Sequence, residues 1–174
     1  TQSLIAMGFD GDLKPSPRNR RGRYVSAQVK VPIPAYEKMS KTGIDKLMSY
    51  MEIDRQGVMQ EQGGFVYSGM GGEIIPALYR GTKVNPRPYN VSCTENVYVE
   101  IKGEDVIFGV ELPNLEVGAT SNREGPICPT AREVLKFMGI GTSKEFAAAA
   151  AAITLAGEFN FTLLHLRGEM YADK

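Results

Sequence analysis

The sequence has few of the residues from which metal and redox sites are built. It contains two cysteines, Cys93 and Cys128, and a single histidine, His165. Two cysteines make neither a disulfide scaffold nor a four-thiolate zinc site, and one histidine excludes a multi-histidine metal centre. We therefore expect no metal and no cofactor.

Long apolar segments are also scarce. We find no run that approaches the roughly 20 residues needed to span a bilayer. We also find no signal peptide, because Asp10 and Asp12 follow only a short apolar run. The 174 residues, 43% of them hydrophobic and 23% charged, are typical of one globular domain.

The net charge is zero, but the charges are unevenly placed along the chain. Residues 1–41 hold eight basic and three acidic side chains, whereas residues 42–174 hold twelve and seventeen. The basic excess is concentrated between residues 14 and 23, where Pro15, Pro17 and Gly22 oppose regular structure. We predict a flexible basic arm over residues 1–22 and a single core domain over residues 23–174.

A positively charged arm attracts phosphate, either on anionic lipid headgroups or on nucleic acid. A solvated tail that only aids solubility is the alternative. No aromatic side chain lies between the arginines to stack on bases, which disfavours pure RNA binding. The predicted anionic-contact residues are Lys14, Arg18, Arg20, Arg21 and Arg23.

Alternating apolar and polar residues predict several strands. Residues 24–31 alternate cleanly, and Pro32 and Pro34 end this strand. Residues 97–101 and 106–112 alternate on either side of the turn at 102–105, which predicts a hairpin. Residues 65–67 and 73–79 are read as further short strands. Residues 159–166 are read as a last strand, with extension of the preceding helix as the alternative.

Helical spacing and N-terminal capping patterns predict three helices. One begins near Thr42 and runs to about Asp54, and a short one begins at Thr130 and ends at Gly139. The third begins at Thr142 and runs through six alanines to about Ala156. Together with the strands this gives an α+β fold, with a mainly antiparallel sheet of four to six strands and about three helices.

Few patterns in the sequence indicate catalysis. Residues 69–72 are rich in glycine but lack the spacing of a phosphate-binding loop. A nucleophile pair of His165 with Cys93 or Cys128 is formally possible, although neither cysteine has a recognised flanking signature. We therefore predict no catalytic residue. A small enzyme that uses Cys128 or His165 remains the least favoured alternative.

The alanine run suggests close approach of another backbone. An alanine-faced helix has no bulky side chains, so it packs tightly either on the chain's own sheet or on a second copy. Exposed methionine also makes an adaptable contact surface. The residues predicted for self-association are Ala147, Ala148, Ala151, Met70 and Tyr67.

The order of these features resembles that of a rhabdovirus matrix protein, especially the small ones of plant rhabdoviruses. The resemblance rests on the basic arm at 14–23, the strand at 24–31, the helix near 42–54, the Gly/Met/Tyr segment at 65–72 and the later hairpin. It implies a non-enzymatic virion protein that self-associates and binds anionic membrane. It also implies contact with the viral nucleocapsid beneath the envelope, at the periphery of host membranes.

We therefore predict a non-enzymatic structural protein of matrix type that bridges nucleocapsid and membrane. An RNA-binding capsid or accessory protein that uses the same arm is the alternative. Because the basic and acidic excesses lie in different parts of the chain, we expect copies to attract one another and salt to weaken their assembly.

Overall fold

The computed structural model describes residues 14–15, 23–52, 74–78, 96–115 and 129–169. These residues form the strands β1 (Lys14–Pro15), β2 (Arg23–Pro32), β3 (Asn96–Lys102) and β4 (Asp105–Leu115). They also form the helices α2 (Ile33–Ser40), α6 (Pro129–Phe137) and α7 (Ser143–Arg167), and two helices at 44–52 and 74–78. The predicted α+β class is confirmed.

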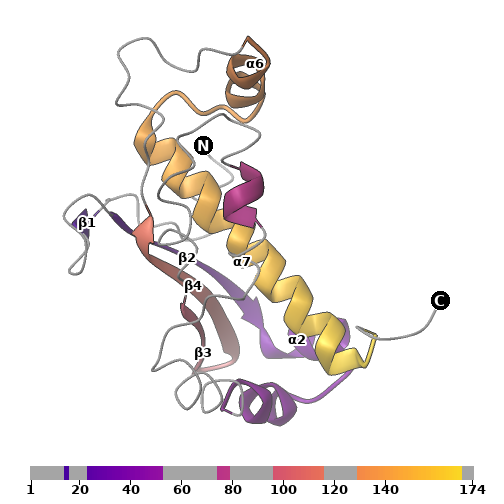
Figure 1. The fold of residues 1–174 in the computed structure, drawn as a ribbon. Coiled ribbons are helices and arrows are strands. Elements are labelled where there is room, and N and C mark those ends of the chain that lie inside the picture. The colour runs from indigo at the N-terminus through magenta and orange to yellow at the C-terminus, as the bar shows by residue number, and fades with distance from the viewer. Residues whose placement is uncertain (1–13, 16–22, 53–73, 79–95, 116–128, 170–174) are drawn as a thin grey trace.

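All strands of the sheet are antiparallel, in the order β1-β2-β4-β3 (Figure 1). Three strands are long, and β1 is a two-residue pairing at one edge. The predicted number of four to six strands is therefore not confirmed. The hairpin of β3 and β4 is confirmed, and its turn contains Gly103, whose positive φ of 63° favours glycine.

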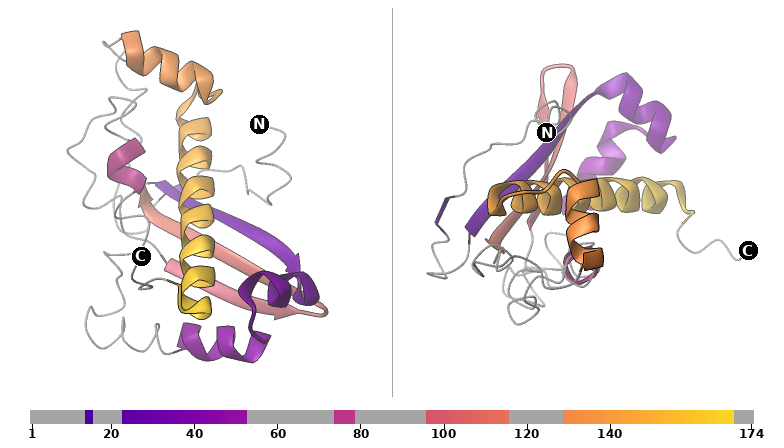
Figure 2. Two further views of the ribbon diagram at one scale, coloured as in Figure 1. Left: turned by 90° about the vertical axis from the view of Figure 1, so that its right-hand side faces the viewer. Right: turned by 90° about the horizontal axis from the view of Figure 1, so that it is seen from above.

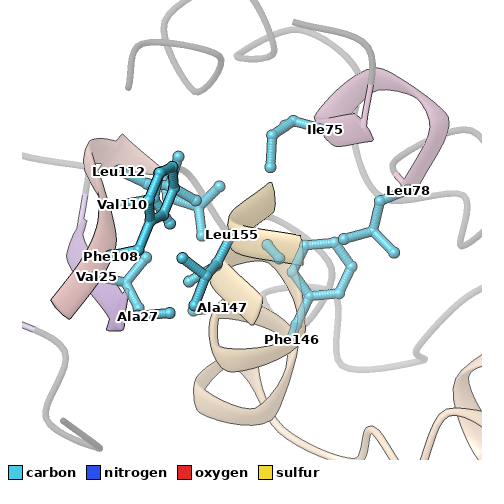
Figure 3. Close-up of a cluster of buried hydrophobic side chains, with 13 residues drawn as sticks. Val25, Ala27, Ile75, Leu78, Phe108, Val110, Leu112, Phe146, Ala147 and Leu155 are labelled. Atoms are coloured by element: carbon cyan, nitrogen blue, oxygen red, sulfur yellow. The ribbon is translucent and has the colours of Figure 1, made fainter. Parts of the chain in front are cut away.

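The helix α7 crosses one face of the sheet diagonally (Figures 1 and 2). The sheet contributes a buried stripe from alternate positions of β2 and β4, which follows from the two-residue period of a strand. Figure 3 shows this stripe facing α7, with Ile75 and Leu78 of the helix at 74–78 on the other side of α7. The cluster includes Val25, Ala27, Phe108, Val110, Leu112, Phe146, Ala147 and Leu155.

The alanines of α7 are packed inside the molecule. Ala147 and Ala151 are fully buried and Ala148 is nearly so, and Ala147 and Ala151 belong to the cluster against the sheet. Small side chains here allow the helix backbone to approach β2 and β4 closely. The structure thus shows packing on the chain's own sheet for Ala147 and Ala151 and burial for Ala148, and self-association stays a prediction.

Both ends of α7 are capped. At its start, the Thr142 hydroxyl accepts from the Glu145 N–H, and the Glu145 carboxylate accepts from the Thr142 N–H at 2.8 Å. This is the capping box that the sequence predicts. At its end, Gly168 adopts the left-handed conformation, with φ of 72°. Arg167 then donates from Nε to the Met39 carbonyl at 2.7 Å, which ties the end of α7 to α2.

Two of the predicted strands are wrong, because both segments are helical. Residues 159–166 belong to α7, so the alternative of an extended helix is confirmed. Within this segment Phe159, Leu163 and Leu166 recur at helical spacing and pack in the buried clusters. Residues 74–78, which include Pro76, are helical. The segment at 65–67 lies outside the described residues.

The helix α2 is absent from the sequence-based prediction. Pro32 and Pro34 do end β2, but they also begin a helix, because proline fits the first helical positions where no N–H bond is needed. Tyr36 on this helix is fully buried in a second cluster with Leu47, Val106, Leu163 and Leu166. Phe159 contacts both the Tyr36 and Phe108 rings edge-on and so joins the two clusters.

The helix α7 is long and apolar enough to cross a membrane by length and composition alone. This differs from the prediction that no apolar run is long enough. Most of its apolar stretch is buried inside the fold, against the sheet and its neighbouring helices. A core helix of this kind passes the same test.

Candidate functional site on the polar face of the sheet

The face of the sheet turned away from α7 carries a polar surface. Three rows of cross-strand neighbours lie on it, because residues that pair across antiparallel strands share a face. The rows run from β2 through β4 to β3 and consist of Ser26, Glu111 and Asn96; Gln28, Gly109 and Tyr98; and Lys30, Ile107 and Glu100. Seven of these nine residues are polar, and Ile107 and Gly109 are buried between them; we call the nine residues the polar face.

Glu111 is the centre of a hydrogen-bond network at one end of the polar face. The Tyr24 hydroxyl donates to one of its carboxylate oxygens, and Asn96 Nδ2 donates to the other at 2.9 Å. Tyr24 is part-buried, and this burial together with the Glu111 carboxylate raises the pKa of its phenol above the usual range. Tyr24 therefore stays protonated, and its hydroxyl remains a donor at any physiological pH.

Tyr98 lies across the middle of the polar face, over Gly109. A Cβ placed on Gly109 would lie 2.2 Å from the Tyr98 ring, so only glycine leaves room for the ring there. The Tyr98 hydroxyl donates to Gln28 Oε1 at 3.3 Å, which spans the full row from β3 to β2. Burial, followed by the negative charges of Glu111 and Glu100, raises the Tyr98 pKa. This phenol also remains a neutral donor.

The chemistry offered by this surface is hydrogen bonding. Together with Tyr24, it combines two protonated phenols, two amide side chains, a serine hydroxyl, the carboxylates of Glu100 and Glu111 and the ammonium group of Lys30. Lys30 pairs with Asp105 at 2.7 Å at the end of β2. No group of three or more histidine, cysteine, aspartate or glutamate side chains suited to a metal occurs in the described part of the chain.

The predicted basic contact residues lie partly on the edge of this sheet. Lys14 is in β1 opposite Tyr24, and Pro15 is opposite Arg23 in β2. The two strands thus bring positions 14 and 23 to one place, beside the Tyr24–Glu111 network. Arg18, Arg20 and Arg21 lie outside the described residues, as do Met70 and Tyr67. The flexibility predicted for residues 1–22 stays a prediction.

The alternative catalytic pair is not brought together in the described residues. Cys93 and Cys128 lie outside them. His165 is exposed near the end of α7, where its ring lies against that of Tyr50 with 4.7 Å between centroids.

Sequence reasoning missed the polar face, although it predicted each strand that forms it. Ser26, Gln28 and Lys30 are the polar half of the alternation at 24–31, and Tyr98 and Glu100 are that of the hairpin. The missing information is the pairing of β2 with β4, two strands far apart in sequence. A local pattern does not specify such a pairing.

Comparison with known proteins gives one informative similarity. No protein-family model matches the chain. The chain is 25% identical over 170 residues to a 3-hydroxy-3-methylglutaryl-coenzyme A reductase from the archaeon Aeropyrum pernix. This alignment covers 91% of the chain and 40% of the reductase. The chain therefore spans less than half the length of the curated relative that it matches.

This similarity corrects two predictions. The matched protein is a reductase. The predicted matrix function, with its alternative of a capsid or accessory protein, is therefore wrong. The prediction of a non-enzymatic protein is wrong for the same reason. The features behind both predictions were the lack of a catalytic constellation in the sequence, a separate basic arm, and long Gly/Pro loops on a small α+β core. These features do not distinguish a structural protein from a part of an enzyme.

Proposed function

We propose that this chain is part of an enzyme that reduces a coenzyme A thioester of the 3-hydroxy-3-methylglutaryl type. The supporting observation is the similarity to a reductase of that name over 91% of the chain. The aligned length takes in nearly all of the chain, so the similarity does not come from a short motif. The role that we propose for the chain within that activity is binding of the thioester.

The substrate class has chemistry that the sheet can recognise. Coenzyme A carries several phosphate charges at its nucleotide end and two amide groups along its flexible arm. Phosphates are bound by lysine and arginine, and amides by hydrogen-bonding side chains. A surface that binds coenzyme A therefore needs cations at one end and polar neutral groups beside them.

The edge of the sheet at β1 and β2 has this arrangement. The antiparallel register places Lys14 opposite Tyr24 and Pro15 opposite Arg23. The connecting residues 16–22 add Arg18, Arg20 and Arg21 to the same stretch of sequence. In this proposal the basic segment contacts the phosphates, which is a new assignment for the predicted anionic-contact residues.

The polar face lies next to this edge and supplies the neutral groups. Tyr24 connects the two parts, because it pairs with Lys14 in the sheet and donates to Glu111 on the polar face. The amides of Gln28 and Asn96 lie on the same face, in neighbouring rows. The coenzyme A arm would run from the basic segment across these rows.

The first test is calorimetric binding of 3-hydroxy-3-methylglutaryl-coenzyme A to the full chain. We expect binding that weakens as salt rises, because exposed charges are screened. Coenzyme A without its 3′-phosphate should bind more weakly than intact coenzyme A. A Lys14→Gln/Arg23→Gln double variant should lose most of that difference, whereas Lys102→Gln, an exposed lysine on the far edge strand, should not.

The second test is turnover. The chain is mixed with the same thioester and a reduced nicotinamide dinucleotide, and thioester-dependent oxidation of the dinucleotide is followed by absorbance. If the chain binds the thioester, and if the Lys14→Gln/Arg23→Gln double variant weakens that binding, the proposed role is supported even when the chain shows no turnover on its own. No detectable binding of the thioester at low salt, together with no turnover, would refute the proposal.

A further inference from the structure

Two amide side chains of the polar face, those of Asn96 and Gln28, each have one end held by a neighbour. Asn96 Nδ2 donates to the Glu111 carboxylate at 2.9 Å. Because an ionised carboxylate accepts hydrogen bonds and donates none, the amide nitrogen of Asn96 must face it. In the other amide, Gln28 Oε1 accepts from the Tyr98 hydroxyl at 3.3 Å. Both amides are therefore oriented by their neighbours in the sheet.

The two amides offer opposite hydrogen-bonding groups to a ligand. Both residues are exposed on the surface of the sheet. Among the described residues, neither Asn96 Oδ1 nor Gln28 Nε2 makes a hydrogen bond. Asn96 thus presents an acceptor and Gln28 presents a donor. A ligand that satisfies both needs an N–H group for Asn96 and a carbonyl for Gln28.

The sheet also sets the spacing and the order of these two groups. Asn96 lies in the row of Ser26, and Gln28 follows two positions further along β2. Two positions of a strand rise by about 7 Å. Ser26 is nearer than Gln28 to Tyr24, which pairs with Lys14 at the basic edge. A ligand that reaches the polar face from the basic edge therefore meets the acceptor first and the donor second.

The arm of coenzyme A carries the matching groups in the same order. Counted from the nucleotide end, the N–H of its first amide is followed by two methylene groups and then by the carbonyl of its second amide. We propose that Asn96 Oδ1 accepts from this N–H and that Gln28 Nε2 donates to this carbonyl, an assignment that rests on the proposed function. These two residues then determine specificity for the arm, whereas the basic segment binds phosphates, which many nucleotides carry.

The expected gain in affinity follows from the two new hydrogen bonds. Each should change the dissociation constant by about threefold, in the lower part of the usual range, because both form on an exposed face where water competes. Two such bonds together amount to about tenfold. Coenzyme A should therefore bind about tenfold more tightly than its nucleotide portion without the arm.

Calorimetry of the full chain at low salt compares these two probes, coenzyme A and its nucleotide portion. The measured quantity is the ratio of their dissociation constants, in which effects on the phosphates cancel. Asn96→Ala and Gln28→Ala should each lower this ratio about threefold. Gln28→Glu keeps an oxygen for the Tyr98 hydroxyl but loses the donor, so it should lower the ratio equally. Glu104→Gln, at an exposed position in the turn between β3 and β4, is the control that should leave the ratio unchanged.

An analogue of coenzyme A tests which group each residue contacts. Replacing the N–H of the first amide by an ester oxygen removes the donor to Asn96. With this analogue Asn96→Ala should have no further effect, whereas Gln28→Ala should still weaken binding about threefold.

The outcomes separate this inference from the proposed function. If both probes bind equally tightly and both depend on Lys14 and Arg23, the inference is overturned and the proposed function stands. A ratio that the Asn96 and Gln28 variants leave unchanged overturns it as well. If neither probe binds, the proposed function fails and this inference fails with it.

Discussion

Replacing Gly109 by alanine is the sharpest test of the polar face. Gly109 lies in the central strand β4, directly beneath the ring of Tyr98. The added Cβ would lie 2.2 Å from the ring, far inside any real contact distance, so the ring must swing away. Its packing over the strand and its hydrogen bond to Gln28 are then lost together.

The expected change in the free energy of unfolding on Gly109→Ala is small, and its sign differs between the wild type and a Tyr98→Ala variant. Losing a cross-strand aromatic contact and one partly exposed hydrogen bond costs about 1–2 kcal/mol. Removing a glycine from a strand returns about 0.5–1 kcal/mol. Gly109→Ala should therefore destabilise the wild type by about 0.5–1 kcal/mol. In a Tyr98→Ala background the same change meets no ring and should stabilise by about 0.5–1 kcal/mol.

The measurement is a double-mutant cycle from urea unfolding. The sequence has no tryptophan, so circular dichroism is the suitable signal. The coupling between the two positions should come to about 1–2 kcal/mol, which for a chain of this size corresponds to a shift of roughly 2–8 °C in Tm. An equal effect of Gly109→Ala in both backgrounds would refute the placement of Tyr98 over Gly109.

Two further predictions concern α2 and α7. Among the described residues the buried Tyr36 hydroxyl has no hydrogen-bond partner, and burial raises its pKa to about 12. Tyr36→Phe should therefore leave stability unchanged or raise it by up to about 1 kcal/mol, and a clear loss in urea unfolding would show that the hydroxyl is satisfied. Hydrogen bonds from the Gly141 N–H and from Thr142 lower the pKa of Glu145. The stabilisation is present above pH 4.5 and lost as the pH falls through the lowered value, so the difference in stability between wild type and Glu145→Gln should shrink on acidification. A constant difference from pH 7 to strongly acidic pH would contradict this.

Local sequence patterns were sufficient wherever a structure depends on near neighbours. The alternation at 24–31 predicts a strand, the turn at 102–105 predicts a hairpin, and the capping box at Thr142 predicts the start of a helix. The structure contains all three. Each signal is contained within a few residues. This is why the elements were predictable before their packing was known.

The failures arise where burial overrides local preference. Residues 159–166 are rich in β-favouring side chains, yet they continue α7, because Phe159, Leu163 and Leu166 recur at helical spacing and pack in the buried clusters. The preceding part of α7 is buried at every position from Phe146 to Ala152, so the sequence there shows no alternation of buried apolar and exposed polar positions that would mark the whole helix as amphipathic. Pro34 was misread for a different reason, since proline ends a strand and begins a helix equally well.

The candidate site was the least predictable part. Its residues come from three strands, and the Tyr24–Glu111 contact joins positions that are 87 residues apart. The polar residues were visible in the alternation, but their meeting depends on the pairing of β2 with β4. Function was also beyond the local patterns, because the basic segment is compatible with lipid, nucleic acid and coenzyme A phosphates alike.

The pairing of β2 with β4 also has a kinetic consequence. In this antiparallel pairing the last residue of β2, Pro32, lies beside the first residue of β4, Asp105. Just beyond it, the Ile33 N–H donates to the Glu104 carbonyl at 2.9 Å. The sheet therefore closes a loop over residues 33–104, and its centre forms only after that distant encounter. Such non-local pairing slows folding, whereas the β3–β4 hairpin, whose strands adjoin, can form early. The closure cost grows slowly with loop length, at about 0.6 kcal/mol for each doubling. Lengthening the loop should thus change the closure cost only slightly, whereas any change that delays β2 leaves the edge of β4 open to other strands.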